Sequence, residues 1–249
     1  MDGEPALRVV PDYAAMSRAA ADVVAATVSR KPDAAIALPT GSTPLGMYDD
    51  LARRARTGAV DLSRAQFYGL DEYLGVTPED PMSFTGWLLR SFIVPAGLPP
   101  AHFHPMPVTA PDVAAAAAEY DASLAAGGGL DLAVLGLGPN GHIAYNEPGS
   151  AADSPTRVVT LTARSREQAS GYWDDEVPIP ARAMTIGVAP LLAAKEILLI
   201  VAGAEKADVL RTALRGPMSA SVPATWLRLA GGRLTVVADE AAARGLDGA

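Results

Sequence analysis

Short apolar runs alternate with segments of helical periodicity along nearly the whole chain, and this alternation limits the possible folds most. The run Leu132–Leu137 contains no polar side chain, as expected of a strand that is buried on both faces of a sheet. Tyr13–Val28 instead places Met16, Ala20, Val23 and Val24 at helical spacing. Strands that alternate with helices are typical of a parallel sheet, so the sequence predicts an α/β protein.

The same reading along the chain predicts one layered domain. With 249 residues, of which 49% are hydrophobic, the chain can bury a large core, and no composition break, linker or repeat divides it. We therefore expect a single-domain, Rossmann-like, mostly parallel sheet with helices on both faces, over residues 1–249. Further strands are expected at Leu7–Val10, Ala34–Leu38, Gln66–Leu70, Val158–Leu161, Met184–Val188, Ile197–Ala202 and Leu234–Ala238, and further helices from about Pro44 and at Ser83–Phe92, Pro111–Ala125 and Glu205–Arg215.

Composition excludes several classes of function. No apolar run is long enough to span a membrane, and the acidic start does not resemble a secretory signal, so we expect a cytoplasmic protein without a membrane partner. The absence of cysteine removes disulfides, thiolate nucleophiles and Cys-ligated zinc. A net charge of −8 with scattered basic residues argues against a nucleic-acid partner.

A glycine-rich loop after the strand Leu132–Leu137 holds one of the three histidines of the chain. Gly138 and Gly141 allow the backbone to turn sharply and to approach a ligand, while His142, Asn146 and Glu147 supply hydrogen-bonding and titrating groups. Open α/β sheets bind ligands at the carboxyl ends of their strands. This loop is therefore the first candidate for a catalytic site.

The loop between the strand Ala34–Leu38 and the next helix reads Pro-Thr-Gly-Ser-Thr-Pro and is a candidate phosphate site. Unpaired backbone N–H groups at a helix start, with hydroxyls from Thr40, Ser42 and Thr43, bind anions well. The pattern is not a Walker loop, which argues against hydrolysis of a nucleoside triphosphate. The alternative is an ordinary turn that caps a helix.

Two adjacent carboxylates, Asp71 and Glu72, follow the strand Gln66–Leu70. A carboxylate at the end of a strand is well placed to take a proton from a substrate carbon, and partial burial would raise its basicity. The alternative is that the pair caps the following helix or pairs with arginine. His102 and His104 alternate as metal ligands would, but no third ligand is adjacent, so we interpret them as loop residues and expect no metal.

The three loops together resemble the glucosamine-6-phosphate deaminases of the NagB-like sugar-phosphate isomerase superfamily, from about Val10 to Ala238. The family carries a Thr-Gly-rich phosphate loop, an Asp-Glu-Tyr segment such as Asp71–Tyr73, and a Gly-His-Ile-Ala-x-Asn-Glu-Pro segment such as Gly141–Pro148. The related 6-phosphogluconolactonases more typically read Asp-Gly-His-Thr-Ala-Ser-Leu-Phe-Pro. The deaminase branch is therefore favoured, with one NagB-like domain over residues 1–249.

The resemblance implies an aldose-to-ketose isomerisation that releases the amine, converting glucosamine 6-phosphate to fructose 6-phosphate and ammonia. No cofactor is implied, and the only partner implied is the small-molecule sugar phosphate. Asp71 would move a proton from C2 to C1, and His142, oriented by Glu147, would assist ring opening. The implied phosphate ligands are Thr40, Gly41, Ser42, Thr43 and Lys206; Gly138, Gly141, Arg166 and Tyr172 are further candidate substrate contacts.

Three positions depart from the family pattern. Asn140 stands where many members have Asp, and we expect it to accept the imidazole N–H as a fourth catalytic-site residue. Gly171 stands where the family has a phosphate-binding Arg, which Arg164 or Arg166 could replace. Val159 stands where the allosteric members have Lys, so activation by N-acetylglucosamine 6-phosphate is not expected and their hexamer is not implied.

Other functions stay open at this stage. A galactosamine-type phosphate is an alternative substrate, because Gly171 leaves specificity loose, and 6-phosphogluconolactone hydrolysis is another. A sugar-phosphate sensor without catalysis is the alternative from a different class, although the chain begins directly with its first strand and has no helix-turn-helix ahead of it. A homo-oligomer remains open beside a monomer.

Overall fold

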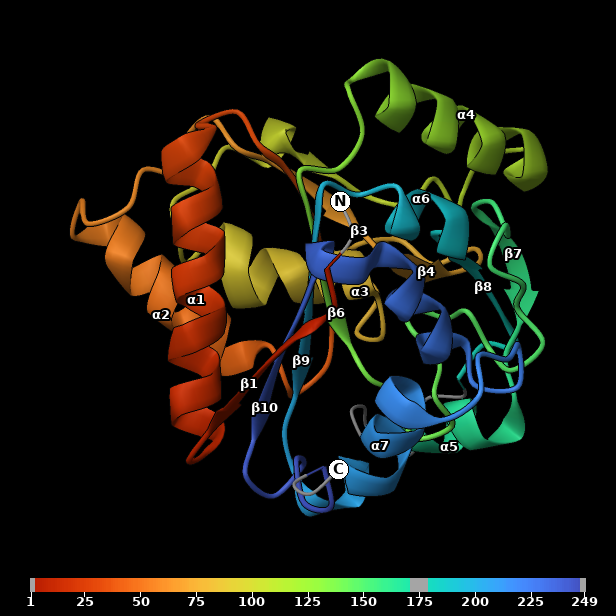
Figure 1. Ribbon diagram of the computed structural model, residues 1–249. Helices are drawn as coiled ribbons and strands as arrows, with labels where there is room; N and C mark the ends of the chain where they lie inside the picture. Colours follow the sequence, from red (N-terminus) through yellow and green to blue (C-terminus); the bar gives the residue numbers. More distant parts are fainter. Residues whose placement is uncertain (1–2, 171–178, 247–249) are drawn as a thin grey trace.

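A seven-stranded parallel sheet forms the centre of the protein in this computed structural model, which describes residues 3–170 and 179–246 (Figure 1). All neighbouring strands in it run parallel. Their spatial order is β1 (Ala6–Val10), β10 (Leu234–Asp239), β9 (Glu196–Val201), β6 (Leu132–Gly136), β2 (Ala35–Leu38), β3 (Gln66–Gly69) and β5 (Phe103–His104). The run that we predicted as a central strand lies in the middle of the sheet.

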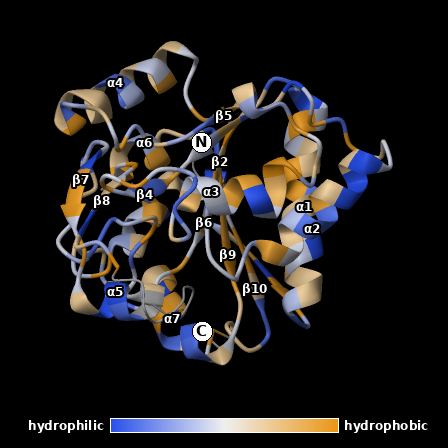
Figure 2. Cartoon of the chain, turned by 180° about the vertical axis from the view of Figure 1, so that it is seen from behind, coloured by the Kyte–Doolittle hydropathy of each residue, from blue (hydrophilic) through white to orange (hydrophobic). Residues whose placement is uncertain are grey.

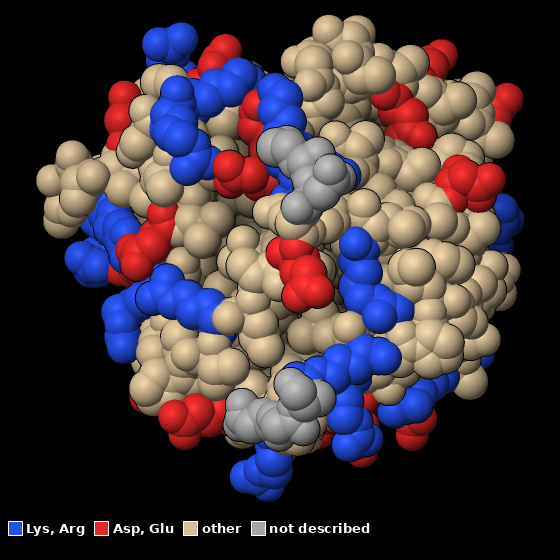
Figure 3. All heavy atoms as spheres, viewed as in Figure 1, with Lys and Arg blue, Asp and Glu red and all other residues tan. Residues whose placement is uncertain are grey.

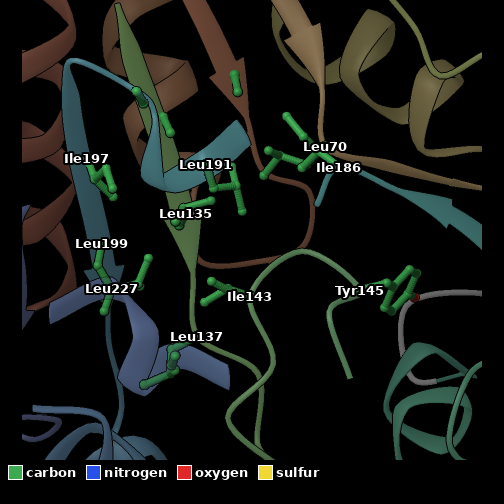
Figure 4. Packing of buried hydrophobic residues seen from close by; sticks show 14 of the residues in the cluster. Leu70, Leu135, Leu137, Ile143, Tyr145, Ile186, Leu191, Ile197, Leu199 and Leu227 are labelled. Atoms are coloured by element: carbon green, nitrogen blue, oxygen red, sulfur yellow. The ribbon is translucent and has the colours of Figure 1, made fainter. Parts of the chain in front are cut away.

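Both faces of this sheet are buried, because the strands alternate apolar side chains between two cores. In β6, Leu132 and Val134 belong to one core, whereas Ala133 and Leu135 belong to the other. β9 repeats the alternation, and Figure 4 shows its Ile197 and Leu199 beside Leu135 of β6. Seen from behind, the central strands carry mainly hydrophobic residues (Figure 2). Side chains with a period of two therefore produce a three-layer protein.

Helices cover each core, as the sequence predicted. The first core contains residues of α1 (Tyr13–Arg30), α2 (Leu45–Arg56) and the π-helix η1 (Leu89–Ile93), which continues α3 (Phe84–Leu88). The second core contains residues of a different group of helices, and Figure 1 shows these on the opposite side of the sheet. They are α4 (Val113–Ala126), α6 (Val188–Leu192), α7 (Ala207–Arg215) and the 3₁₀ segment η4 (Pro223–Arg233).

A second, smaller sheet departs from the simple βα alternation. It consists of β4 (Asp71–Tyr73), β8 (Arg182–Thr185) and β7 (Arg157–Thr160), and both of its pairings are antiparallel. Our predicted strands at residues 158–161 and 184–188 therefore belong to this sheet, and the second one ends earlier because α6 begins at Val188. Periodicity identifies a strand but does not identify the strand with which it pairs.

The order of the strands fixes where a ligand can bind. From β2 the chain adds β3 and β5 on one side, then crosses back to place β6 on the other side of β2. In open α/β sheets, ligands bind at such a reversal, outside the carboxyl ends of the strands. The loops that follow β2, β3 and β6 are the three that the sequence singled out. Within the described ranges, none of the helices combines the length and apolar character needed to span a bilayer.

Candidate active site

A cavity of about 920 Å³ opens at the carboxyl ends of β2, β3, β6 and β9. The loops after these strands supply most of its wall, and α5 (Ala163–Ser170) supplies another part. The predicted site residues that line it are Thr40, Gly41, Ser42, Thr43, Asp71, Gly138, His142 and Lys206. Segments from distant parts of the chain thus meet around one space of a size usual for small-molecule sites.

The loop Thr40–Thr43 presents unused hydrogen-bond donors to the cavity. The N–H groups of Gly41, Ser42 and Thr43 make no hydrogen bond with any residue that the structure describes. Gly41 has a φ of 97°, a backbone conformation that favours glycine. The Tyr13 hydroxyl fixes the loop, since it donates to the Ser42 carbonyl at 3.1 Å and accepts the Gly46 N–H at 2.8 Å. A rigid loop with free N–H groups at the start of α2 is suited to an anion.

Two cations, Lys206 and Arg164, line the same cavity as this loop. The Nζ of Lys206 donates to the carbonyl oxygen of Leu137 at 2.9 Å, and burial lowers the pKa of this lysine, an effect that the nearby Arg164 reinforces and Glu205 opposes. Arg164 is exposed and lines the cavity, whereas Arg166 does not line it. Arg166, which we expected to contact the substrate, therefore does not face the cavity whereas Arg164 does, because residues two apart on a helix point in nearly opposite directions.

The adjacent carboxylates Asp71 and Glu72 have different environments. Glu72 is 1% exposed and accepts hydrogen bonds from the Ser83 hydroxyl at 2.7 Å and from the N–H groups of Phe84 and Thr85 at 3.1 and 2.8 Å, at the start of α3. The side chain of Asp71 lines the cavity and accepts no hydrogen bond from the described part of the chain. Successive strand residues point to opposite faces, so Glu72 binds the start of α3 whereas Asp71 faces the cavity.

The pKa of Asp71 is raised to about 8, mainly because burial disfavours its anionic form and secondly because Glu72 lies beside it. No cation offsets these effects among the charges that act on it. A carboxylate of this basicity is suited to take a proton from carbon near neutral pH. Asp71 thus has both the access and the basicity that a general base requires.

The loop after β6 places the imidazole of His142 against the backbone of Gly138. A Cβ atom at Gly138 would lie 2.2 Å from Cδ2 and Nε2 of the ring, so only glycine allows this position. Asn146 is fully buried and fixes the loop by donating to the carbonyl oxygens of Ile143 and Ile186 at 3.0 and 2.8 Å. Ala144, which lines the cavity, has a φ of 48°, a conformation that is uncommon outside glycine.

Glu147 and Asn140 lie behind His142 and do not line the cavity. Burial opposes ionisation of Glu147, but the neighbouring His142, Ser165 and Asn140 outweigh it and lower the pKa of Glu147 to about 2. Our expectation for Asn140 needs correction. Its Nδ2 donates to Glu147 at 2.7 Å and its Oδ1 accepts the backbone N–H of His142 at 3.1 Å, so its amide contacts the backbone and not the ring.

Gly141 and Tyr172 were also expected to contact the substrate. Gly141 is a turn residue: its φ is 83°, and an added Cβ would lie 2.5 Å from Cγ1 of Val222, away from the cavity lining. Tyr172 and Gly171 lie outside the described residues. Sequence reasoning missed Ser165 as a neighbour of His142 and Tyr145 as an aromatic wall of the cavity between His142 and Asp71. The Gly-His-Ile-Ala-Tyr spacing could have suggested Tyr145, but no pattern pointed to Ser165.

The other two histidines lie elsewhere. His104 is part of the edge strand β5 and not of a loop; it stacks on Tyr68 at 4.5 Å between ring centroids, and its Nε2 lies 2.8 Å from Oε1 of Gln66. Within residues 3–170 and 179–246, no three His, Asp or Glu side chains are grouped as metal ligands. On the face shown in Figure 3, Lys and Arg are dispersed among Asp and Glu.

Comparison with known proteins agrees with this geometry. The profile of the family described as glucosamine-6-phosphate isomerases/6-phosphogluconolactonase matches residues 12–236. A glucosamine-6-phosphate deaminase of Streptomyces avermitilis is 41% identical over 94% of this chain and 90% of its own length. That of Rhodopirellula baltica is 36% identical over 97% of this chain and 96% of its own.

Solved structures extend the comparison. A structure described as a monomeric glucosamine-6-phosphate deaminase superimposes with a TM-score of 0.91 at 34% identity and covers 96% of this chain and 98% of its own. The 6-phosphogluconolactonase of Trypanosoma cruzi has a TM-score of 0.79 at 20% identity, covering 100% and 99%, and shares the fold. The chain belongs to the glucosamine-6-phosphate isomerase/6-phosphogluconolactonase family.

Proposed function

We propose that this protein is an enzyme that converts glucosamine 6-phosphate and water to fructose 6-phosphate and ammonia. One observation carries the proposal: Asp71, which accepts no hydrogen bond from the described residues and whose pKa is raised to about 8, lines the same cavity as His142 and the loop Thr40–Thr43. A base, an imidazole and an anion site around one space match the three needs of this isomerisation.

The proposed reaction uses these side chains and water. His142 transfers a proton between the anomeric hydroxyl and the ring oxygen, which opens the pyranose. Asp71 then takes the proton from C2 and returns it to C1 through an enol-type intermediate. The resulting C2 imine adds water and releases ammonia, leaving the ketone. Correctly placed acid–base groups contribute ~10²–10⁴-fold each to such a reaction.

The phosphate would bind at the loop Thr40–Thr43. The free N–H groups of the loop, the hydroxyls of Thr40, Ser42 and Thr43, and the partial positive charge at the start of α2 all favour an anion there. Lys206 would donate a hydrogen bond to a phosphate oxygen, either in place of its bond to the Leu137 carbonyl or in addition to it. Arg164 would supply the second cation, the role that the sequence left open between Arg164 and Arg166.

The relatives favour the deaminase over the alternatives. Proteins 36–41% identical to this chain are named glucosamine-6-phosphate deaminase, whereas the lactonase structures are 18–21% identical and support the fold alone. A sensor without catalysis has no need of a carboxylate kept unpaired and basic beside an imidazole. A galactosamine-type phosphate, which differs at C4, is the remaining alternative substrate.

A coupled assay tests the proposal by measuring ammonia and fructose 6-phosphate formed from glucosamine 6-phosphate. We expect both products in equal amounts, and galactosamine 6-phosphate and 6-phosphogluconolactone tested in parallel separate the alternatives. Turnover of the lactone alone would establish the lactonase. Absence of turnover, together with thermal stabilisation by a sugar phosphate, would establish the sensor.

For location and assembly we propose a cytoplasmic enzyme that needs no nucleic-acid or membrane partner. Its neighbour described as monomeric, with a TM-score of 0.91, favours a monomer over a homo-oligomer. Light scattering coupled to gel filtration separates the two, because a dimer would double the 25.6 kDa mass of the chain.

A further inference from the structure

The imidazole of His142 lies too far from Glu147 for a hydrogen bond. Its Nδ1 is 3.8 Å from the nearest carboxylate oxygen, Oε2, although both side chains are largely buried, at 12% and 8% exposed. Asn140 does not close this gap, because its amide already contacts Glu147 and the His142 backbone. A third group is therefore needed to hold the ring and to connect it to the negative charge.

Ser165 of α5 occupies that place. It is 2% exposed, and its Oγ lies 3.3 Å from Nδ1 of His142. The Oγ1 of Thr162 lies 3.0 Å from Ser165 Oγ and 3.3 Å from each carboxylate oxygen of Glu147. We infer that Ser165 is a positioning residue, which links the imidazole of His142 to the carboxylate of Glu147 and, with Thr162, fixes the tautomer of the ring.

The number of protons on the imidazole and the hydroxyl groups determines which group donates in each hydrogen bond between His142 and Glu147. The hydroxyls of Ser165 and Thr162 can each accept a hydrogen bond, and each has one proton to donate. Glu147, the carboxylate at the end of this cluster, accepts from the Thr162 hydroxyl. The favourable arrangement therefore runs from Nδ1–H of His142 to Ser165, from Ser165 to Thr162 and from Thr162 to Glu147, which leaves Nε2 unprotonated.

This tautomer suits the ring-opening step of the proposed function, on which the inference rests. Nε2 makes no hydrogen bond with the described residues and is the ring nitrogen left to take a proton from the sugar. When it does so, the imidazolium is stabilised by Glu147 through the hydroxyls of Ser165 and Thr162. Without Ser165, the ring would lose the one side-chain hydrogen-bond partner that it has among the described residues and could adopt the other tautomer.

The variant Ser165→Ala tests this role with two measurements. We expect kcat for glucosamine 6-phosphate to fall about 10–100-fold while KM changes less than about threefold, because the sugar contacts stay in place. In the substrate-free protein, the ¹⁵N shifts of His142 should move from the Nδ1–H tautomer towards a mixture, and with three histidines in the chain the signals are few. Ser165→Thr, which keeps the hydroxyl, should restore both readouts at least in part.

Ser29→Ala is the matched control. It also removes a helical serine hydroxyl, one that donates to the Ala25 carbonyl in α1 away from the cavity, and both readouts should stay as in the wild type. Unchanged His142 shifts in Ser165→Ala would overturn the inference, and so would an unchanged kcat. Should Ser165→Ala fail to fold, Thr162→Val serves with the same criteria. The tautomer is measured without substrate, so it is informative even if the proposed substrate is wrong.

Discussion

Two buried aspartates at opposite ends of the central sheet have opposite environments. Asp131 precedes β6 at the amino end, is 6% exposed, and accepts hydrogen bonds from Lys31 at 2.6 Å, from Lys195 at 2.7 Å and from the Ala35 N–H at 2.8 Å. Burial opposes its ionisation, but these bonds outweigh burial and lower its pKa. Asp71, which begins β4 just beyond the carboxyl end of β3, has no such partner among the described residues, and its pKa is raised to about 8.

The contrast between Asp131 and Asp71 distinguishes polar groups that stabilise the fold from polar groups that could react with a substrate. Two of the three lysines of the chain stabilise the Asp131 carboxylate, which links the ends of α1, β6 and β9. At the other end of the sheet, the carboxylate of Asp71 and the N–H groups of Gly41, Ser42 and Thr43 make no hydrogen bond with the described residues. Unpaired polar groups reduce stability, so they persist where function needs them. The following variants test this division.

The largest expected effect is the loss of activity in Asp71→Asn. The amide cannot accept the C2 proton, so kcat should fall about 10²–10⁴-fold in the coupled assay. The same variant should be more stable. Between pH 4 and 8 the folded protein keeps a proton on Asp71 that the unfolded chain loses. The free energy of unfolding of the wild type therefore falls as the pH rises through this range. Asp71→Asn has no carboxyl group to titrate and does not lose this stability.

Thermal unfolding checks the second half of this prediction. The gain of Asp71→Asn over the wild type should grow from pH 5 to pH 8 and reach on the order of a few kcal/mol. Full activity in Asp71→Asn would remove Asp71 as the base. A loss of stability at pH 8 would mean that the carboxylate has a partner that the structure does not show.

The next effect is the pH dependence of kcat/KM in the wild type. Asp71 must be ionised to act as a base, so kcat/KM should rise about tenfold per pH unit below pH 7 and level off near the pKa of about 8. Glu147, with its pKa of about 2, stays ionised throughout and adds no step in this range. A profile that is flat from pH 5 to 8 contradicts the assignment of Asp71.

A smaller effect, on stability alone, is expected for Asp131→Ala. The Ala35 N–H would lose its partner while the exposed lysines return to water, which destabilises the fold by about 1–3 kcal/mol. Since the folded pKa of Asp131 is lowered, this difference should be present at neutral pH and disappear as the pH falls through that pKa. kcat should not change.

Asp33→Ala is the control for this variant. Asp33 contacts the same Lys31 at 3.9 Å but is 60% exposed, and the loss should stay below about 0.5 kcal/mol. Equal destabilisation by the two variants would show that the buried hydrogen bonds of Asp131 do not matter, and the comparison between the two ends of the sheet would fail.

The sequence predicted the parallel sheet and the convergence of three loops, because strand ends and glycine turns are local signals with a fixed geometric consequence. It could not separate Asp71 from Glu72, since only tertiary packing determines that Glu72 binds the start of α3 and that Asp71 lines the cavity. It also could not place Ser165 or choose between Arg164 and Arg166. Which of these side chains face the cavity depends on the rotation of α5 about its axis, and packing against the His142 loop sets that rotation. A helix of eight residues is too short for its sequence pattern to indicate the rotation.

That rotation can be tested with Arg164→Met and Arg166→Met. Loss of a cation beside the phosphate removes a charge-assisted contact, so the first variant should raise KM about tenfold with a smaller change in kcat. The second removes an equal charge from the same helix, at a residue that does not line the cavity, and should leave KM unchanged. A rise in KM for Arg166→Met alone would mean that α5 is rotated from the position described here. Ser165 would then no longer face His142, so the same result would also contradict the role of its hydroxyl.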